Sequence, residues 1–151
     1  MMKTSGRAIP LLVRLAENKV SGVLHRVGEI KNMLTKLEER LLQLTELRND
    51  YTERLRSLQL DKGLSEAQNL RRFIKSLLDM EDRLKAERES IEGRLAQAMS
   101  DLAQARLDQK KMQSLLERQS SRQAKADEEK EQRAMDAAGI ARFNRQTVSF
   151  R

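Results

Sequence analysis

The sequence predicts an all-α fold in which two long helices form an antiparallel coiled-coil hairpin and the second helix overhangs the first. Two observations predict it: an apolar 3,4 spacing on both sides of one turn-forming segment, and a composition suited to long helices. Of 151 residues, 35% are charged and 38% are apolar, with one Pro, three Phe, one Tyr and no Trp. So few large side chains argue against a compact globular core, whereas narrow apolar faces between wide charged ones are typical of coiled coils.

The first helix is expected over about residues 10–60, after an N-terminal extension of residues 1–9. Its apolar residues alternate in steps of three and four, a mean period of 3.5, which keeps one stripe against a partner when the helices supercoil left-handedly. Arg48 is the one charged residue in this stripe, and we interpret it as a register or solvation device rather than a binding site. The a and d positions are Val13, Ala16, Val20, Val23, Val27, Ile30, Leu34, Leu37, Leu41, Leu44, Arg48, Tyr51, Leu55 and Leu58.

A turn is expected at residues 61–65, where Asp61 and Gly63 are turn formers. Ser65 and Gln68 then form a Ser-x-x-Gln capping box, which predicts a second helix over about residues 66–138. A double step of four, from Glu87 to Ile91 and on to Leu95, predicts a stutter that unwinds the supercoil locally. The expected second stripe is Leu70, Phe73, Leu77, Met80, Leu84, Glu87, Ile91, Leu95, Ala98, Leu102, Ala105, Gln109, Met112 and Leu116.

The two stripes match in length. A hairpin folded about Lys62 and Gly63 places Leu116 near Ile9, so the second stripe ends where the first helix runs out of chain. This agreement predicts an intramolecular hairpin, and deletion from Glu117 onward should leave it folded. Gly139 is expected to stop the second helix, leaving residues 139–151 as a flexible basic tail.

The sequence offers no catalytic motif, and we expect neither an enzyme nor a bound cofactor or metal. Catalysis needs positioned groups in a concave site, which a two-helix hairpin does not supply. The chain has no Cys, and its one histidine, His25, falls on the outermost heptad position. The acidic run at residues 127–129 lies between Lys125 and Lys130 and is interpreted as a solvated helical face.

The net charge of +7 suits attraction to an acidic protein surface or pore. Specific nucleic-acid binding is not expected, because Lys and Arg are interspersed with Asp and Glu and aromatic residues are scarce. The apolar run at residues 9–13 contains Pro10 and is too short for a signal peptide or a transmembrane segment. A soluble cytoplasmic protein is therefore expected.

Local motifs around the predicted turn resemble the FliJ family, the small coiled-coil component of the flagellar protein-export machine. Late in the first helix, Leu44–Tyr51 is similar to the family's Leu, acidic and Asn-x-Tyr pattern. In the second helix, the similar segments are Phe73–Leu77, Leu116–Ser120 and Glu131–Asp136. The resemblance covers residues 12–143, and it departs from the family pattern at Leu47, where a second Tyr would be expected.

The resemblance implies a stalk that binds the pore of the hexameric export ATPase, links it to the membrane export gate, and holds export chaperones. It implies a location at the cytoplasmic face of the inner membrane, with peripheral association through the export apparatus, and a role in flagellum biogenesis, protein transport and chemotaxis. The residues that would face the ATPase are Arg118, Gln119, Gln132, Arg133 and Met135. Those that would face the gate are Leu44, Tyr51, Phe73 and Leu77, although all four also suit packing inside the coiled coil.

Two alternatives remain at this point. A virulence type III injectisome uses stalk proteins that look alike at this level, and a basic coiled coil that binds nucleic acid would share the charge. Neighbouring genes for flagellar or injectisome parts would distinguish the flagellar stalk from the injectisome stalk. DNA binding that depends on salt and on base sequence would indicate the nucleic-acid-binding protein.

Overall fold

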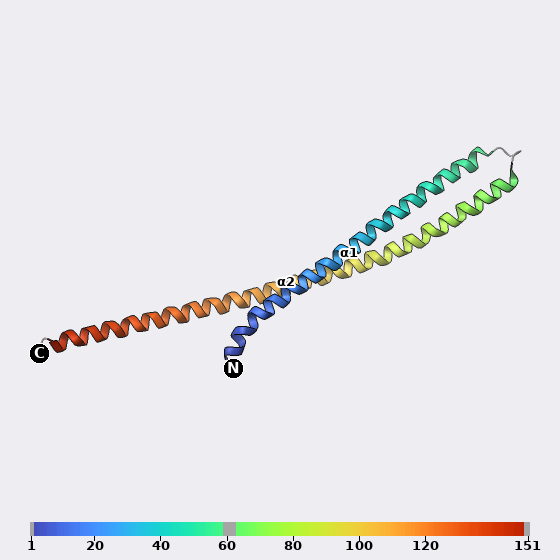
Figure 1. Cartoon of the computed structure of the whole chain (residues 1–151). Helices are drawn as coiled ribbons and strands as arrows, with labels where there is room; N and C mark the ends of the chain where they lie inside the picture. Colours follow the sequence, from blue (N-terminus) through green and yellow to red (C-terminus); the bar gives the residue numbers. More distant parts are fainter. Residues whose placement is uncertain (1, 59–62, 150–151) are drawn as a thin grey trace. The chain divides into compact units, whose positions relative to one another are not determined.

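The computed structural model describes residues 2–58 and 63–149. Within these ranges the chain forms two α-helices, α1 (Met2–Ser57) and α2 (Leu64–Ser149), and no strand (Figure 1). The two long helices pack against each other, which confirms the predicted all-α antiparallel hairpin with a longer second helix.

The chain divides into two compact units, which we call the terminal unit and the loop unit. The terminal unit consists of Met1–Lys19 and Ala105–Arg151, and the loop unit consists of Val20–Gln104. In the loop unit, the later part of α1 runs antiparallel to the first part of α2.

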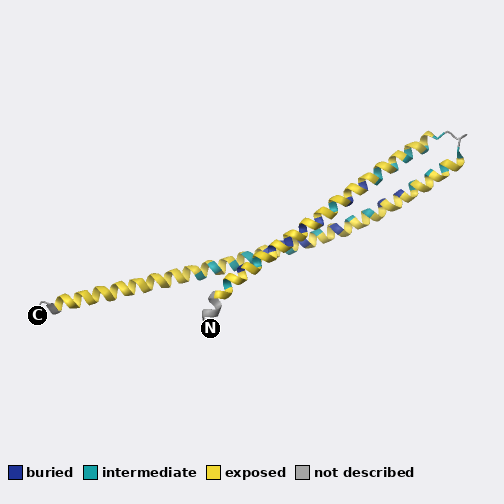
Figure 2. Cartoon of the chain, viewed as in Figure 1, coloured by how far each residue is buried: buried dark blue, intermediate teal, exposed yellow. Residues whose placement is uncertain are grey.

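The predicted stripe of α1 is confirmed at every position. All fourteen residues from Val13 to Leu58 at the expected a and d sites are buried or half-buried, and most residues between them are exposed (Figure 2). Burying a Val, Leu or Ile side chain contributes about 1.5–3 kcal/mol, so this stripe is the main source of helix pairing. The most buried members are Val13, Val20, Val23, Val27, Ile30, Leu37 and Leu41.

The predicted stutter in α2 is wrong. Phe73 and Met80, expected in the stripe, are 42% and 49% exposed, and Glu87 is exposed as well. The inward positions are instead the residues that follow each of them, so the 3,4 spacing runs without interruption. The observed stripe of α2 is Ala67, Leu70, Ile74, Leu77, Glu81, Leu84, Arg88, Ile91, Leu95, Ala98, Leu102, Ala105, Gln109, Met112, Leu116 and Gln119.

The start of α2 also differs from the expected one. The helix begins at Leu64, and the backbone N–H of Ala67 donates to the carbonyl of Gly63 at 2.8 Å, so Gly63 is the N-cap. Ser65 is an exposed residue of the first turn, where Glu66 supplies a negative charge at the positive end of the helix. Residues 61–62 of the expected turn, and the expected end of the first helix at residue 60, lie outside the described residues.

Both helices extend beyond the other expected boundaries. α1 begins at Met2 and contains Pro10, whose missing N–H removes one i→i−4 hydrogen bond without ending the helix. α2 continues through Gly139 to Ser149, so the expected helix stop is wrong. A helical Gly costs about 1 kcal/mol relative to Ala, and the neighbouring Ala137, Ala138 and Ala141 are the best helix formers.

The assignment of Gly63 as the N-cap can be tested by substitution. Ser65→Ala should change the free energy of unfolding by less than about 0.5 kcal/mol, because an exposed first-turn residue supplies no cap. A capping box at this position would instead cost about 1 kcal/mol. Gly63→Ala should be costlier, because a Cβ at residue 63 would lie 3.0 Å from the Cβ of Glu66. Urea unfolding followed by circular dichroism compares the two, and a larger loss for Ser65→Ala would restore the capping box.

Candidate partner-binding surfaces

The first candidate surface is the part of α2 that buries nothing, residues 121–147, which we call the unpaired segment. Every side chain in this range is exposed (Figure 2). The expected ATPase-facing residues Gln132, Arg133 and Met135 lie in it, and Met135 is 68% exposed. Arg118 is exposed just before it, whereas Gln119 is half-buried and is the last inward position of α2.

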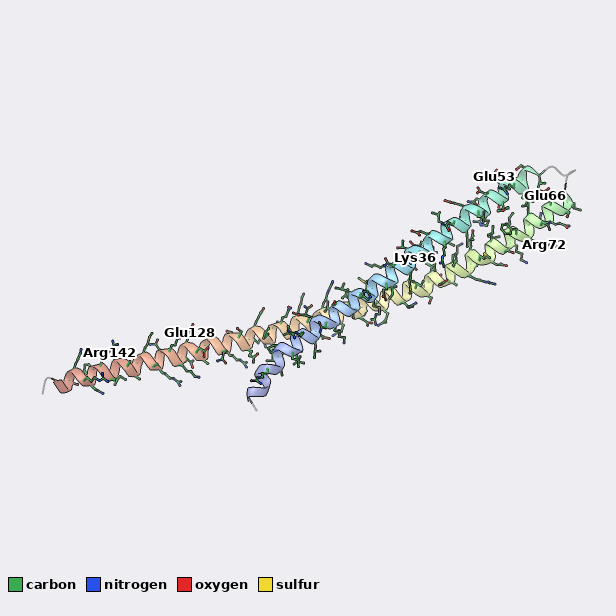
Figure 3. All side chains as sticks on the ribbon, in the orientation of Figure 1. Lys36, Glu53, Glu66, Arg72, Glu128 and Arg142 are labelled. Carbon is green, nitrogen blue, oxygen red and sulfur yellow. The ribbon has the colours of Figure 1, made fainter. Side chains whose placement is uncertain are left out.

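Polar side chains occupy all sides of the unpaired segment. At about 100° per residue, Arg133 and Met135 point to nearly opposite sides of the helix. Amides and carboxylates one turn apart are paired: Gln123 donates to Asp127 at 3.3 Å and Gln132 to Asp136 at 3.4 Å. Such pairs stabilise a helix that has no packing partner. The side chains of Glu128 and Arg142 extend from this stretch in Figure 3.

The second candidate surface is the aromatic pair of the loop unit. The rings of Tyr51 and Phe73 meet edge to face, with centroids 4.7 Å apart and an interplanar angle of 65°. The guanidinium of Arg54 lies 5.0 Å from the centroid of the Tyr51 ring, within the range of a cation–π interaction. Tyr51 is half-buried and Phe73 is exposed, so this pair presents aromatic surface at the side of the helix pair.

The other two expected gate-facing residues lie differently. Leu77 is only 3% exposed and belongs to the helix–helix contact, and Leu44 is half-buried in the same stripe of α1. Leu47 and Met80, by contrast, are exposed apolar residues close in sequence to the aromatic pair. The structure therefore brings Tyr51 and Phe73 together and places Leu77 where packing is its main role.

A charged layer crosses the loop unit beside the aromatic pair. The Nε of Arg48 donates to Oε1 of Glu81 at 2.9 Å, and the Glu81 side chain is 3% exposed. The sequence marked Arg48 as a polar interruption but missed Glu81. The signal for Glu81 was the uninterrupted 3,4 spacing from Leu77 through Glu81 to Leu84. It was missed because the expected stripe took the apolar Met80 in place of the charged Glu81.

A shallow groove of about 370 Å³ also lies between the helices of the loop unit. Leu37, Leu84 and Ile91 contribute its apolar part, and Lys36, whose position is labelled in Figure 3, is one of its cations. The full lining is Met33, Lys36, Leu37, Arg40, Leu84, Glu87, Ser90, Ile91 and Arg94.

The described residues contain no group of three or more His, Cys, Asp or Glu side chains placed to hold a metal ion. His25 is exposed, and its Nε2 lies 3.0 Å from Oε1 of Glu29 one turn later. Nearby, Arg26 pairs with Asp101 across the two helices at 2.6 Å. Both contacts lie at the surface, where such pairs contribute little to stability.

These features define an all-α protein of two long paired helices, with exposed candidate partner-binding surfaces. The chain belongs to the FliJ family: the family described as flagellar FliJ protein matches residues 7–147, nearly the whole sequence. No curated protein and no solved structure matches it. Membership makes it a flagellar export-related protein from a non-enzymatic family. In the described residues, neither helix has a stretch apolar and long enough to cross a membrane.

Proposed function

We propose that the protein is the coiled-coil stalk of the flagellar export apparatus, which binds the hexameric export ATPase and links it to the export gate. The unpaired segment of α2 is the observation that carries this proposal. The family match favours the flagellar stalk over its injectisome counterpart.

The unpaired segment suits a partner that surrounds it. Its side chains are exposed on every side, and Arg133 and Met135 point in nearly opposite directions. A flat partner surface would contact one face of such a helix, whereas the pore of a ring contacts all of them. Gln132, Arg133 and Met135 of this segment are assigned to the contact, together with Arg118 and Gln119, which lie just before it.

The aromatic pair suits the export gate. Tyr51 and Phe73 combine accessible ring surface with the adjacent guanidinium of Arg54, and aromatic and Arg side chains are enriched at the energetic centres of interfaces. Leu44 and Leu77 support this surface from inside the helix pair. We assign the exposed Phe73 ring and the accessible part of the Tyr51 ring to the contact itself, and Leu77 to the framework beneath.

Charge adds long-range attraction to these contacts. A net charge of +7 favours encounter with acidic partner surfaces and makes the association rate sensitive to salt. The proposed location is the cytoplasmic face of the inner membrane, reached through the gate. Binding of empty export chaperones is part of the same proposal, with no residues assigned to it.

The test is to mix the purified chain with its cognate export ATPase and measure binding and the rate of ATP hydrolysis. We expect complex formation and a raised hydrolysis rate. Replacing Gln132, Arg133 and Met135 together with Ala should weaken binding by roughly tenfold or more, as truncation of interface anchors does. His25→Ala, an exposed substitution in the loop unit, is the matched control. The absence of both binding and a rate change with the unmodified chain would refute the ring assignment.

A further inference from the structure

The buried ion pair between Arg48 and Glu81 has an arrangement that stability alone does not explain. Glu81 is the one buried charged residue among those described, with 2% of the whole residue exposed. Its Oε1 accepts from Nε of Arg48 at 2.9 Å, and no buried side-chain N or O atom in the described ranges lacks a partner. A buried ion pair gains little over a well-packed apolar pair, yet breaking it is costly. The Arg48–Glu81 ion pair therefore affects which alignment of the two helices forms more than it affects the free energy of folding.

The aliphatic layers around the pair discriminate poorly between registers. If α2 slipped by one heptad, leucines and isoleucines would still meet leucines across the contact. The charged layer is not interchangeable in this way. A slip in one direction sets Arg48 level with Arg88 and Glu81 level with Leu55; a slip in the other sets Arg48 level with Ile74. Either slip leaves a buried charge unpaired.

A second pair shows that the loop unit keeps one register. Arg26 and Asp101 pair at 2.6 Å, but both side chains are well exposed, so this contact is screened by water and salt. From Arg26 to Arg48 is 22 residues along α1, and from Asp101 back to Glu81 is 20 along α2. The two separations differ by two residues, much less than a heptad, so both ion pairs belong to the same register. Breaking the buried pair by a slip costs more free energy than breaking the exposed one.

The same register brings the aromatic rings together. Tyr51 lies one turn after Arg48 on α1, and Phe73 lies two turns before Glu81 on α2. A one-heptad slip would set Tyr51 level with Met80 or with Glu66 instead of Phe73. The edge-to-face contact at 4.7 Å therefore depends on the alignment that the ion pair selects.

We infer that Arg48 and Glu81 are positioning residues: their buried ion pair selects the register of the hairpin and thereby assembles the Tyr51–Phe73 surface. The consequence for gate binding rests on the proposed function, whereas the choice of register does not. With apolar residues at both position 48 and position 81, the helices would still pair, but no single register would be selected.

The test uses the full chain, which has no native cysteine. Met33→Cys is combined in turn with Glu87→Cys, Arg94→Cys and Asp101→Cys, three positions spaced one heptad apart on α2. Met33 follows Arg26 by one heptad and Arg94 precedes Asp101 by one heptad, so positions 33 and 94 repeat the level of the Arg26–Asp101 pair. A disulfide between positions 33 and 94 therefore reports the native register, and the other two report the slipped ones. Each pair is oxidised in the parent, in Arg48→Leu/Glu81→Leu and in the charge swap Arg48→Glu/Glu81→Arg.

In the parent and the charge swap, we expect the disulfide between positions 33 and 94 to dominate, because an unpaired buried charge disfavours a slipped register by roughly 100-fold or more. In the double-Leu variant, slipped disulfides should form in comparable amounts. Tyr51 is the sole tyrosine and there is no Trp, so the near-UV tyrosine band reports its surroundings alone. That band should weaken in the double-Leu variant and persist in the charge swap.

A double-Leu variant that forms only the native-register disulfide and keeps the tyrosine band would overturn the inference. These two measurements need no partner protein. Binding of the export gate is measured separately, and it should fall in the double-Leu variant and recover in the charge swap. If the parent itself fails to bind the gate, the proposed function loses that partner while the selection of register is judged by the disulfides alone.

Discussion

Removal of residues 121–151 is expected to abolish binding to the export ATPase while leaving the helix pair folded. All described side chains of the unpaired segment are exposed, so its removal sacrifices almost no buried apolar area. The last inward residues of α2, Leu116 and Gln119, remain in the shortened chain. The urea midpoint should therefore stay within experimental error of the parent, and the helical signal should fall only by the share of helix removed.

Two measurements separate the parts of this expectation. Circular dichroism during urea unfolding reports the helix pair, and sedimentation with the ATPase reports docking. A markedly lower midpoint would show that the unpaired segment packs against the hairpin in solution. Undiminished ATPase binding by a folded truncated chain would move the docking surface to another part of the molecule.

The sequence predicts the pairing of the helices well because that information is local and repeated. From Val13 to Leu58, nearly every position of the 3,4 stripe carries an apolar residue, and a single charged member, Arg48, does not obscure the pattern. In α2 the pattern is mixed. Met80 is more hydrophobic than Glu81, the residue after it, and Phe73 and Ile74 are both apolar, so hydrophobicity alone does not select the inward positions. Only the partner helix shows that the inward carboxylate has a counter-charge.

The helix boundaries were less predictable for a different reason. Gly139 and Pro10 are helix breakers by intrinsic preference, but each costs only a part of what the surrounding residues contribute. Similarly, Ser is a better N-cap residue than Gly, yet Gly63 is the observed cap. The first residue of α2 is set by the path of the connection between the helices and not by the capping preference of Ser65. Local preference indicated that a boundary was near without fixing its residue.

Of the candidate sites, the aromatic pair was the more predictable. Tyr51 and Phe73 fall at similar distances from the turn, and a hairpin brings such positions together. Their accessibility could not be predicted from the sequence, because it follows from the position of Phe73 outside the inward stripe. The ATPase-facing residues come from the resemblance, and their role stays a prediction; the structure adds that their helix has no packing partner around Gln132 and Arg133.

Leu77→Ala is expected to destabilise the helix pair far more than Leu78→Ala, although the substitution is the same and the residues are neighbours. Leu77 is 3% exposed in the contact between the helices, whereas Leu78 is 41% exposed. Truncating a buried Leu costs about 2–5 kcal/mol, and a two-helix contact that relaxes into the space should lie near the lower end. Leu78→Ala should cost less than about 1 kcal/mol. Urea unfolding by circular dichroism measures both.

Leu77→Ala and Phe73→Ala together distinguish packing from direct contact with the gate. If Leu77 acts mainly through packing, Leu77→Ala should lose gate binding only in proportion to the loss of folded helix pair, and stabilising conditions such as added osmolyte should restore it. Phe73→Ala should behave in the opposite way, with a small loss of stability and a large loss of gate binding, because the ring is accessible. Equal destabilisation by Leu77→Ala and Leu78→Ala would contradict the uninterrupted stripe. Leu77 faces inward in the expected stripe as well, so the variant that separates the two stripes is Phe73→Ala: a loss of stability as large as that of Leu77→Ala would return the inward face of α2 to the arrangement in which Phe73 and Met80 pack against α1.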